Sequence, residues 1–493
     1  MRSRPLGAST GFAAEDVPAV ILAAGSGTRI SAGNGGRPKP LTRFLGMTLL
    51  ERAVLSCRAA GVETVYVVVG FAKDEVAAHV NRLAAKHDFD VRVIHNPWWE
   101  EGNGTSALAS APYIDGPFFL MMADHLFDPT IISMLRAAPR AAETSLLAVD
   151  KRVRGVFDLD DATKVELDGD SLVSIDKELG AYDAIDTGIF LCDPVLFSAL
   201  RLAQRRGEGS LSGGMRQLIQ RRLAGSVDIG DKFWIDVDTP ESLAEARKRV
   251  LARMPKGSMD GPIARRLNRP VSRRISAVLS HTPVTPNLIS VFSFLLAVAG
   301  GLAFGVGGYL WPLIAGVLVQ MASVIDGSDG EIARLKFRAS PFGGWFDSIL
   351  DRYADLAIVA GITYGFWSVS PTPATWIVGL FAAAGFTMYS YSRKEYQVSH
   401  GEPLPERFPF ILIPASRDVR IFIIFLGALA GLAFPAMLLA GSLSHLAVAT
   451  RLFAGRPRKQ RRTGSEPVVT AVDPSAEIFS APAEPERAPT FAE

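Results

Sequence analysis

The sequence predicts a doubly wound α/β domain followed by an all-α domain of six transmembrane helices. Three observations predict this architecture. Short apolar strands alternate with amphipathic helices up to residue 250, and apolar runs of membrane length fill residues 287–453. A basic segment, residues 251–286, joins the two parts. A chain of 493 residues is long enough for both domains.

Composition excludes several classes of protein. A formal net charge of +2 argues against a nucleic-acid partner, because such proteins carry a strong basic excess. The two cysteines rule out a disulfide framework and fit a reducing compartment. Residues 1–15 contain no continuous apolar core, so we expect a loose leader rather than a signal peptide. Residues 454–493 are rich in Pro, Ala, Glu and Ser and are expected to be disordered.

The α/β part, residues 16–250, begins with a strand that runs into a glycine-rich turn. Residues 18–24 are almost all apolar, as in a central parallel strand. Gly25 and Gly27 follow, and their backbone N–H groups are suited to phosphate oxygens. The turn has neither the Lys-Ser/Thr pair of a P-loop nor the spacing of a dinucleotide fingerprint. Arg29 and Lys39 follow the turn, and these two cations make the phosphate-binding pattern more specific.

The pattern LAAGSGTR, then PKPL and Gly46, resembles the nucleotidyltransferase family that makes sugar nucleotides and related activated alcohols. The resemblance implies a doubly wound fold. It implies that Arg29 and Lys39 neutralise a triphosphate, with Lys39 at the reacting phosphate. The positions that it assigns to the nucleotide are Leu22, Ala23, Ala24, Gly25, Gly27, Lys39, Gly102, Asn103, Thr105 and Ser106.

Three acids in this part match the family's metal-binding segments. Asp124 follows an apolar strand, at the edge where open α/β sheets bind ligands. Asp236 and Asp238 alternate along a predicted strand and should point to one side, so the three acids are expected to hold Mg²⁺ or Mn²⁺. Asp238 also precedes a Thr-Pro-Glu triplet, so it could instead cap a helix. His125 is interpreted as a hydrogen-bonding bystander.

A hairpin-rich insertion occupies residues 150–188 and is expected to close over a second substrate. On resemblance alone, Lys177, Asp186 and Thr187 are the candidates for contacts with that substrate. Residues up to about 250 are expected to be soluble when expressed alone.

The membrane part contains six apolar runs that approach the roughly 20 residues of a spanning helix, near 288–305, 309–325, 345–367, 374–391, 419–433 and 435–452. Basic clusters occupy alternate loops, which predicts that those loops and both termini are cytoplasmic. We therefore expect a multi-pass protein of the cell membrane. The linker, residues 251–286, is expected to form an amphipathic helix on the anionic membrane surface.

Four carboxylates, Asp326, Asp329, Asp347 and Asp351, lie within the apolar part. On helices, the first two share a face (i, i+3) and so do the last two (i, i+4). Ionisable residues in such places are functional candidates by default. Four converging carboxylates need cations, and an all-oxygen ligand set suits Mg²⁺ or Mn²⁺.

The stretch 326–351 resembles the CDP-alcohol phosphotransferase family, whose pattern D-x2-D-G-x2-A-R-x8-G-x3-D-x3-D it meets at every position. The resemblance implies that the four acids bind metal and that Asp351 is the general base. The positions matched to the CDP-linked nucleotide are Pro286, Asn287, Gly330, Ala333 and Arg334. Arg393, Arg417 and Arg420 are candidates for the phosphate of an acceptor, or else ordinary inside-positive anchors.

The fusion narrows the substrates, because a nucleotidyltransferase joined to a consumer of CDP-alcohols should itself make a CDP-alcohol. The combination resembles bifunctional enzymes that make CDP-inositol from CTP and inositol 1-phosphate. Those enzymes pass phosphoinositol to a second inositol 1-phosphate, giving the precursor of a compatible solute. The resemblance also implies a homodimer. Two alternatives stay open: another alcohol or a lipid acceptor, and a cation transporter with a nucleotide-sensing domain.

Overall fold

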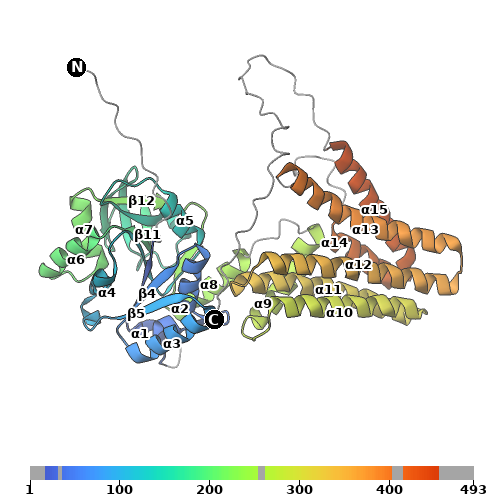
Figure 1. The fold of residues 1–493 in the computed structure, drawn as a ribbon, viewed down its shortest axis with the longest axis horizontal. Coiled ribbons are helices and arrows are strands. Elements are labelled where there is room, and N and C mark those ends of the chain that lie inside the picture. Colours follow the sequence, from blue (N-terminus) through green and yellow to red (C-terminus); the bar gives the residue numbers. More distant parts are fainter. Residues whose placement is uncertain (1–16, 32–35, 254–260, 402–414, 455–493) are drawn as a thin grey trace, which may run out of the picture.

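The structure is a computed structural model that describes residues 17–31, 36–253, 261–401 and 415–454. The leader, residues 1–15, and the tail beyond residue 454 lie outside the described residues. Figure 1 shows two parts side by side: a strand-rich part, and a bundle of long helices that begins beside α2, α8 and α9.

A mixed sheet of nine strands forms the centre of the first part, in the order β5-β4-β1-β6-β11-β8-β12-β10-β9. Its strands are β1 (Ala19–Ala23), β4 (Thr64–Val69), β5 (Asp90–His95), β6 (Phe118–Met122), β8 (Ser145–Asp150), β9 (Lys164–Asp168), β10 (Ser171–Asp176), β11 (Ala184–Cys192) and β12 (Ala224–Asp228). The strands β5, β4, β1 and β6 run parallel, and β11 lies antiparallel to β6 and β8. Strand order reverses between β1 and β6, where doubly wound sheets bind ligands.

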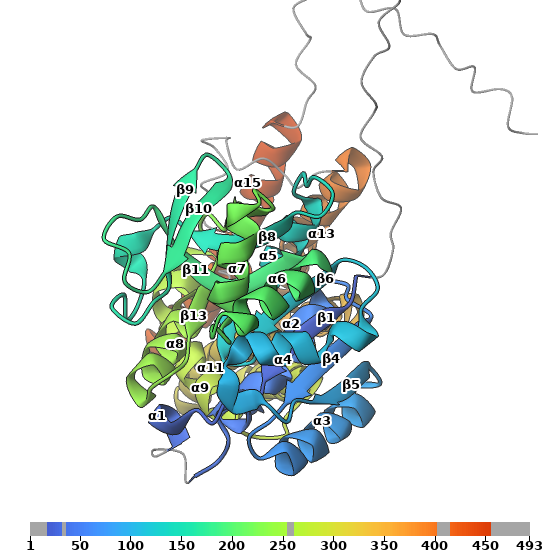
Figure 2. The same cartoon turned by 90° about the vertical axis from the view of Figure 1, so that its left-hand side faces the viewer.

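Helices cover both faces of this sheet, as predicted. Alternate residues of β1 face opposite cores: Ile21 packs with α2 (Leu49–Ala59), α3 (Lys73–His87) and α5 (Thr130–Ala137). Leu22 packs with α4 (Asn103–Ala109), α6 (Val195–Arg205) and α7 (Leu211–Gln220), which are in front in Figure 2. A run of apolar residues buried on both faces is what a central parallel strand requires.

Smaller elements complete this part. They are the helix α1 (Thr28–Ser31), a 3-10 turn at Lys39–Leu41, the ribbon β2 (Arg43–Phe44) with β3 (Met47–Thr48), the ribbon β7 (His125–Phe127) with β13 (Trp234–Asp236), and α8 (Pro240–Arg253). β9 and β10 pair antiparallel, so the predicted hairpin in the 150–188 insertion is present.

The described residues of the second part form α9 (Arg269–Leu279), preceded by a π-helical turn at Ala264–Asn268, and then α10 (Pro286–Val306), α11 (Leu310–Leu335), α12 (Pro341–Val369), α13 (Pro373–His400), α14 (Arg417–Leu429) and α15 (Ala433–Ala454). Three of these helices, α10, α11 and α15, are long and apolar enough to cross a membrane. α14 has 13 residues, about 20 Å, against a hydrocarbon core of about 30 Å. Six helices, α10 to α15, are therefore present among the described residues, whereas six spans are not shown.

The predicted amphipathic helix is α9, and its polar face is buried against the protein. Ser272 and Ser276 are fully buried, and their hydroxyls donate to the buried carboxylate of Glu331 on α11 at 2.8 and 2.7 Å. The exposed side of this segment carries Leu267, Val271 and Val278. The helix is thus held to α11 by hydrogen bonds, a contact that the sequence analysis did not predict.

The two parts share one apolar core. Phe44, Leu45 and Leu49 of the first part pack in a cluster with Ile289 and Leu335 of the second. Each of these side chains is at most 4% exposed. A fragment ending near residue 250 would therefore expose apolar surface that the full chain buries, which weakens the expectation that it is soluble alone.

Candidate active sites

The first site lies at the carboxyl ends of β1 and β6. A pocket there is lined by Leu22, Ala23, Ala24, Gly25, Ser26, Gly27, Lys39, Gly102, Asn103, Ser106, Met122 and Asp124, among others. Of the positions predicted to bind nucleotide in this part, Thr105 does not line the pocket. Its hydroxyl is buried and bonds to the carbonyls of Trp98 and Gly102 at 2.8 Å, so it holds the loop that precedes α4.

The glycine-rich turn depends on Gly27. Its φ is +57°, a left-handed conformation, and a Cβ there would overlap the side chain of Lys39. The turn and the predicted cation therefore lie in direct contact, which places Lys39 beside the backbone that would bind phosphate.

Lys39 lies among the three predicted metal-binding acids. Its ammonium is 2.5 Å from Asp124 Oδ2 and 3.8 Å from Asp236 Oδ1, and it also bonds to Asp238. Burial opposes the charged form, but the three carboxylates together raise the pKa of Lys39 above its usual range. The sequence analysis expected these acids to converge, and they do.

His125 belongs to the same cluster, although it was interpreted as a bystander. It pairs with Asp236 across the β7–β13 ribbon, and Asp124, His125 and Asp236 each place a ligand atom within 4.8 Å of the others. His125 Nδ1 donates to Thr187 O at 2.7 Å. Burial opposes its protonation, yet Asp236 and Asp124 raise the pKa of His125 to about 10.

The donor set fits a divalent cation. Two buried carboxylate oxygens, Asp124 Oδ1 and Asp236 Oδ1, have no hydrogen-bond partner among the described residues. A buried carboxylate oxygen without a donor is costly unless an ion is bound to it. Asp124 and Asp236 are therefore the ligands that this geometry favours.

Asp238 does not cap the helix that follows it. The side chain of Thr239 accepts from the backbone N–H of Ser242 at 3.1 Å, so Thr239 caps α8. Asp238 instead accepts from Arg29 at 2.5 Å and from Lys39. Asp238 therefore lies beside Lys39 and Arg29, and the alternative that it caps α8 is wrong.

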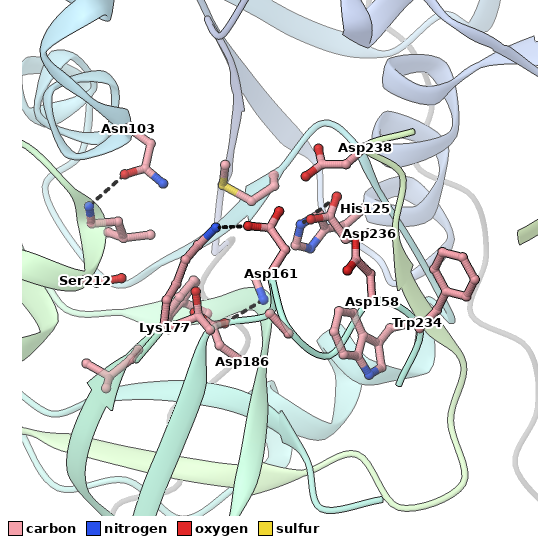
Figure 3. Close-up of a pocket in the computed structure, with 18 of the residues that line it drawn as sticks. Asn103, His125, Asp158, Asp161, Lys177, Asp186, Ser212, Trp234, Asp236 and Asp238 are labelled. Carbon is pink, nitrogen blue, oxygen red and sulfur yellow. Dashed lines mark hydrogen bonds and ion pairs between the residues drawn. The ribbon is translucent and has the colours of Figure 1, made fainter. Parts of the chain in front are cut away.

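A second pocket adjoins the first (Figure 3): Asn103 and Met122 line both pockets, and Asp236 and Asp238 line the second. The predicted residues Lys177 and Asp186 line it. Lys177 donates to Asp161 at 2.6 Å, and the same carboxylate accepts from Arg29 at 2.7 Å. Asp161 was not predicted, because nothing in its local sequence indicates that it bridges two cations.

Asp186 and Thr187 were both predicted to contact the second substrate, but only Asp186 lines this pocket. Asp186 accepts from the backbone N–H of Gly188 at 2.7 Å, and burial raises the pKa of its carboxyl to about 6. Thr187 is fully buried and its hydroxyl donates to Ala148 O at 2.7 Å, away from the pocket.

The second site lies between α10, α11 and α12. Asp326, Asp329 and Asp347 place carboxylate oxygens within 4.8 Å of one another, which fits a divalent cation. Ser290 of α10 donates to Asp329 at 2.5 Å, and Ser293 donates to Asp326 at 3.1 Å. The sequence analysis missed both serines, because a serine in an apolar helix carries no signal of its own.

Arg417 of α14 enters this acidic cluster. It lies 2.7 Å from Asp351 Oδ1, 3.0 Å from Asp326 Oδ2 and 3.2 Å from Asp355 Oδ1. Asp355, one turn beyond Asp351, was not predicted. Arg420 is buried and bonds to Asp355 at 3.0 Å and to the carbonyl of Phe386 at 3.0 Å. Arg420 thus forms a buried ion pair with Asp355.

The residues matched to the CDP-linked nucleotide border this cluster. Pro286 and Asn287 begin α10, after Thr285 caps it. A Cβ at Gly330 would lie 3.3 Å from Arg334 Nη1, so this guanidinium folds back along α11 toward the acids. Ala333 lies on the next turn. Arg393 lies on α13 after Ser392, whose hydroxyl accepts from Arg451 at 3.1 Å.

Comparisons with known proteins match each of the two parts of the chain to a different family. Residues 19–226 match the MobA-like NTP transferase domain, and residues 283–448 match the CDP-alcohol phosphatidyltransferase family. A protein of Rubrobacter xylanophilus named bifunctional IPC transferase and DIPP synthase is 38% identical over 445 residues, or 89% of this chain and 97% of that protein. A protein of the same name from Thermococcus kodakarensis is 35% identical over 83% of this chain and 89% of its own length.

Other relatives match a shorter stretch of the chain. The archaetidylinositol phosphate synthase of Methanothermobacter thermautotrophicus is 36% identical over 165 residues, which is 33% of this chain and 76% of that protein.

Proposed function

Because the chain belongs to the family of bifunctional IPC transferases and DIPP synthases, we propose that it catalyses two consecutive reactions. The first part joins CTP to inositol 1-phosphate, which gives CDP-inositol and diphosphate. The second part transfers phosphoinositol from CDP-inositol to a second inositol 1-phosphate and releases CMP. The product is di-myo-inositol phosphate phosphate.

In the first reaction, a phosphate oxygen of inositol 1-phosphate attacks the α-phosphorus of CTP, and the bond to the β-phosphate breaks. The glycine-rich turn and Lys39 hold the triphosphate. Arg29 lies between that pocket and the adjoining one, because its guanidinium bonds to Asp238 and Asp161. Lys177, on the far side of Asp161, is placed to hold the phosphate of the attacking substrate. Fixed cations stabilise the negative charge that gathers on the departing diphosphate.

In the second reaction, a hydroxyl of the acceptor attacks the inositol-bearing phosphorus of CDP-inositol, and CMP leaves. Asp351 takes the proton of that hydroxyl. Its charge is balanced by Arg417, 2.7 Å away. Gly330 has no side chain and so leaves room for the diphosphate of CDP-inositol, and Arg334 supplies a positive charge beside it. Arg417 is the candidate for the acceptor's phosphate, with Arg393 as a second.

Mg²⁺ fits both acidic clusters, and a bound divalent cation would neutralise phosphate oxygens in each reaction. In the first part Asp124 and Asp236 would hold it, with Asp238 beside them. In the second part Asp326, Asp329 and Asp347 would hold it. Lys39 contacts Asp124 and Asp238 in the first cluster, and Arg417 contacts Asp326 and Asp351 in the second.

We also propose that the protein is a multi-pass homodimer of the cell membrane, with the first part and both termini in the cytoplasm. Basic residues at alternate helix ends support this orientation. The exposed apolar residues of α10, such as Leu288, Leu295 and Leu302, support a lipid-facing surface.

A lipid acceptor is the second candidate, and the similarity of residues in the second part to an archaetidylinositol phosphate synthase favours it. The burial of Arg417 among acids at the reacting end favours a phosphorylated, water-soluble acceptor instead. Supplying CDP-inositol with either inositol 1-phosphate or a lipid alcohol in vesicles decides between them.

The observation that carries the proposal is the presence of two separate acidic clusters on one chain, one in the part that matches NTP transferases and one in the part that matches CDP-alcohol phosphatidyltransferases. Two variants test it. Asp329→Asn should accumulate CDP-inositol from CTP and inositol 1-phosphate. Asp124→Asn should form product only when CDP-inositol is supplied. If neither variant separates the steps, the division of labour is wrong.

A further inference from the structure

We propose that Arg52, in the nucleotidyltransferase part, is a positioning residue for the phosphotransferase site in the other part. Arg52 lies on α2 and is 7% exposed. Its guanidinium donates to Leu335 O at 3.2 Å, to Leu45 O at 3.3 Å and to Phe44 O at 3.2 Å. One side chain of the first part thus bonds to the last residue of α11 in the second.

A cation at the C-terminal end of α11 is well placed to stabilise the last turn of the helix. The last carbonyls of a helix lack intrahelical donors and carry the negative end of the helix dipole. Leu335 is buried in the shared core, so its carbonyl would lose its donor if Arg52 were removed. Burial lowers the pKa of Arg52 to about 10, which leaves the guanidinium charged at neutral pH.

α11 connects this contact to the reacting groups. Asp329 lies six residues before Leu335, about 9 Å along a continuous helix, and Asp326 lies one turn earlier. A shift or fraying of the final turn therefore changes how these two carboxylates meet Asp347 of α12. Misplacement by about 1 Å can cost about 100-fold in rate.

A second contact, from the β2–β3 hairpin, supports α11 through α9. Gly46 has a φ of +84°, and a Cβ there would overlap the backbone carbonyl of Ser280, just after α9. α9 in turn holds α11 through Glu331, which accepts from Arg269, Ser272 and Ser276 at 2.7–2.8 Å. Glu331 lies two residues after Asp329. Contacts from α2, through Arg52, and from the β2–β3 hairpin, through Gly46, therefore support the metal-binding turn along two routes.

The test compares Arg52→Met with Arg58→Met in the full-length protein. Arg58 is the control: it is exposed, unlike Arg52, but it lies on the same helix, donates to a backbone carbonyl (His87, 2.5 Å) and faces a phenylalanine ring, all within the first part. The readouts are diphosphate release from CTP and transfer from supplied CDP-inositol across a Mg²⁺ series. This test rests on the proposed function, since it needs wild-type protein that transfers.

Arg52→Met should lower transfer by about tenfold or more and raise the Mg²⁺ concentration needed for half the maximal rate. Diphosphate release should stay unchanged, and Arg52→Lys should restore part of the transfer. Arg58→Met should leave the transfer rate and its Mg²⁺ dependence unchanged. An unchanged Mg²⁺ dependence in Arg52→Met would overturn the proposal, whatever happens to stability.

A second pair of variants keeps the proposal testable if Arg52→Met does not fold. Gly46→Ala introduces the overlap with Ser280, whereas Gly61→Ala carries a similar backbone strain (φ +75°) with no closer neighbour than Arg136 Nη1 at 3.5 Å. Only Gly46→Ala should impair transfer. Equal effects of both would refute the positioning role, and wild-type protein without transfer would refute the proposed function instead.

Discussion

Replacing Asp351 by Asn should slow the second reaction while sparing substrate binding. The change removes the base but keeps the size of the side chain. A general base typically contributes about 10²–10⁴-fold, or about 2.7–5.5 kcal/mol of transition-state stabilisation. The fold should survive, because Arg417 keeps Asp326 at 3.0 Å and Asp355 at 3.2 Å as partners. Losing every partner of a buried charge costs about 3–5 kcal/mol, and that loss is avoided here.

The assay follows CMP release from supplied CDP-inositol and, separately, the affinity for CDP-inositol, across a Mg²⁺ series. The affinity should change little, because Asp326, Asp329 and Asp347 remain. Asp355→Asn is the control: it removes a carboxylate from the same arginine, one turn further along α12. Near-normal turnover in Asp351→Asn, or equal losses in both variants, would refute the role of Asp351 as the base.

Three other predictions concern the first part and the metal. Lys39→Met and Asp124→Asn should each reduce diphosphate release by about 100-fold or more, with transfer from supplied CDP-inositol intact. Removing divalent cations with EDTA should stop both reactions and added Mg²⁺ should restore both; activity that persists in EDTA would contradict this. Burial opposes the ionised form of Glu51, but hydrogen bonds from Lys86 and His87 lower its pKa below the ordinary 4.5. Its stabilising effect is therefore present above that pH and lost on acidification, so the unfolding temperatures of wild type and Glu51→Gln should converge as the pH falls below it.

Local patterns predicted the α/β sheet, the helical second part and the convergence of the acids, for a physical reason. A buried parallel strand and a helix of membrane length each appear in the sequence as an unbroken run of apolar residues. The spacing of Asp326 and Asp329 places both side chains on one face of a helix. The glycine-rich turn is local in the same sense, because Gly27 and Lys39 are close in the chain and in space.

What the sequence analysis missed depends on contacts between distant segments. His125 meets Asp236 only because β7 pairs with β13. Asp161 meets Arg29 only because the 150–188 insertion folds back to α1. The shared core was missed too, since Phe44 resembles any other buried aromatic until its neighbours are known. The predicted span 419–433 contains a helix that ends at Leu429, because Gly431 adopts a left-handed φ of +73° there.

The claim that one chain performs two consecutive reactions is tested most directly by phosphorus NMR of the purified full-length protein with CTP, inositol 1-phosphate and Mg²⁺. The expected spectrum gains diphosphate first, then a transient CDP-inositol signal, and finally CMP together with a product that has one phosphodiester and one phosphomonoester. Release of diphosphate without release of CMP would contradict the reaction proposed for the second part. A spectrum in which CTP stays intact would contradict the function proposed for the first part, and with it the claim of two consecutive reactions.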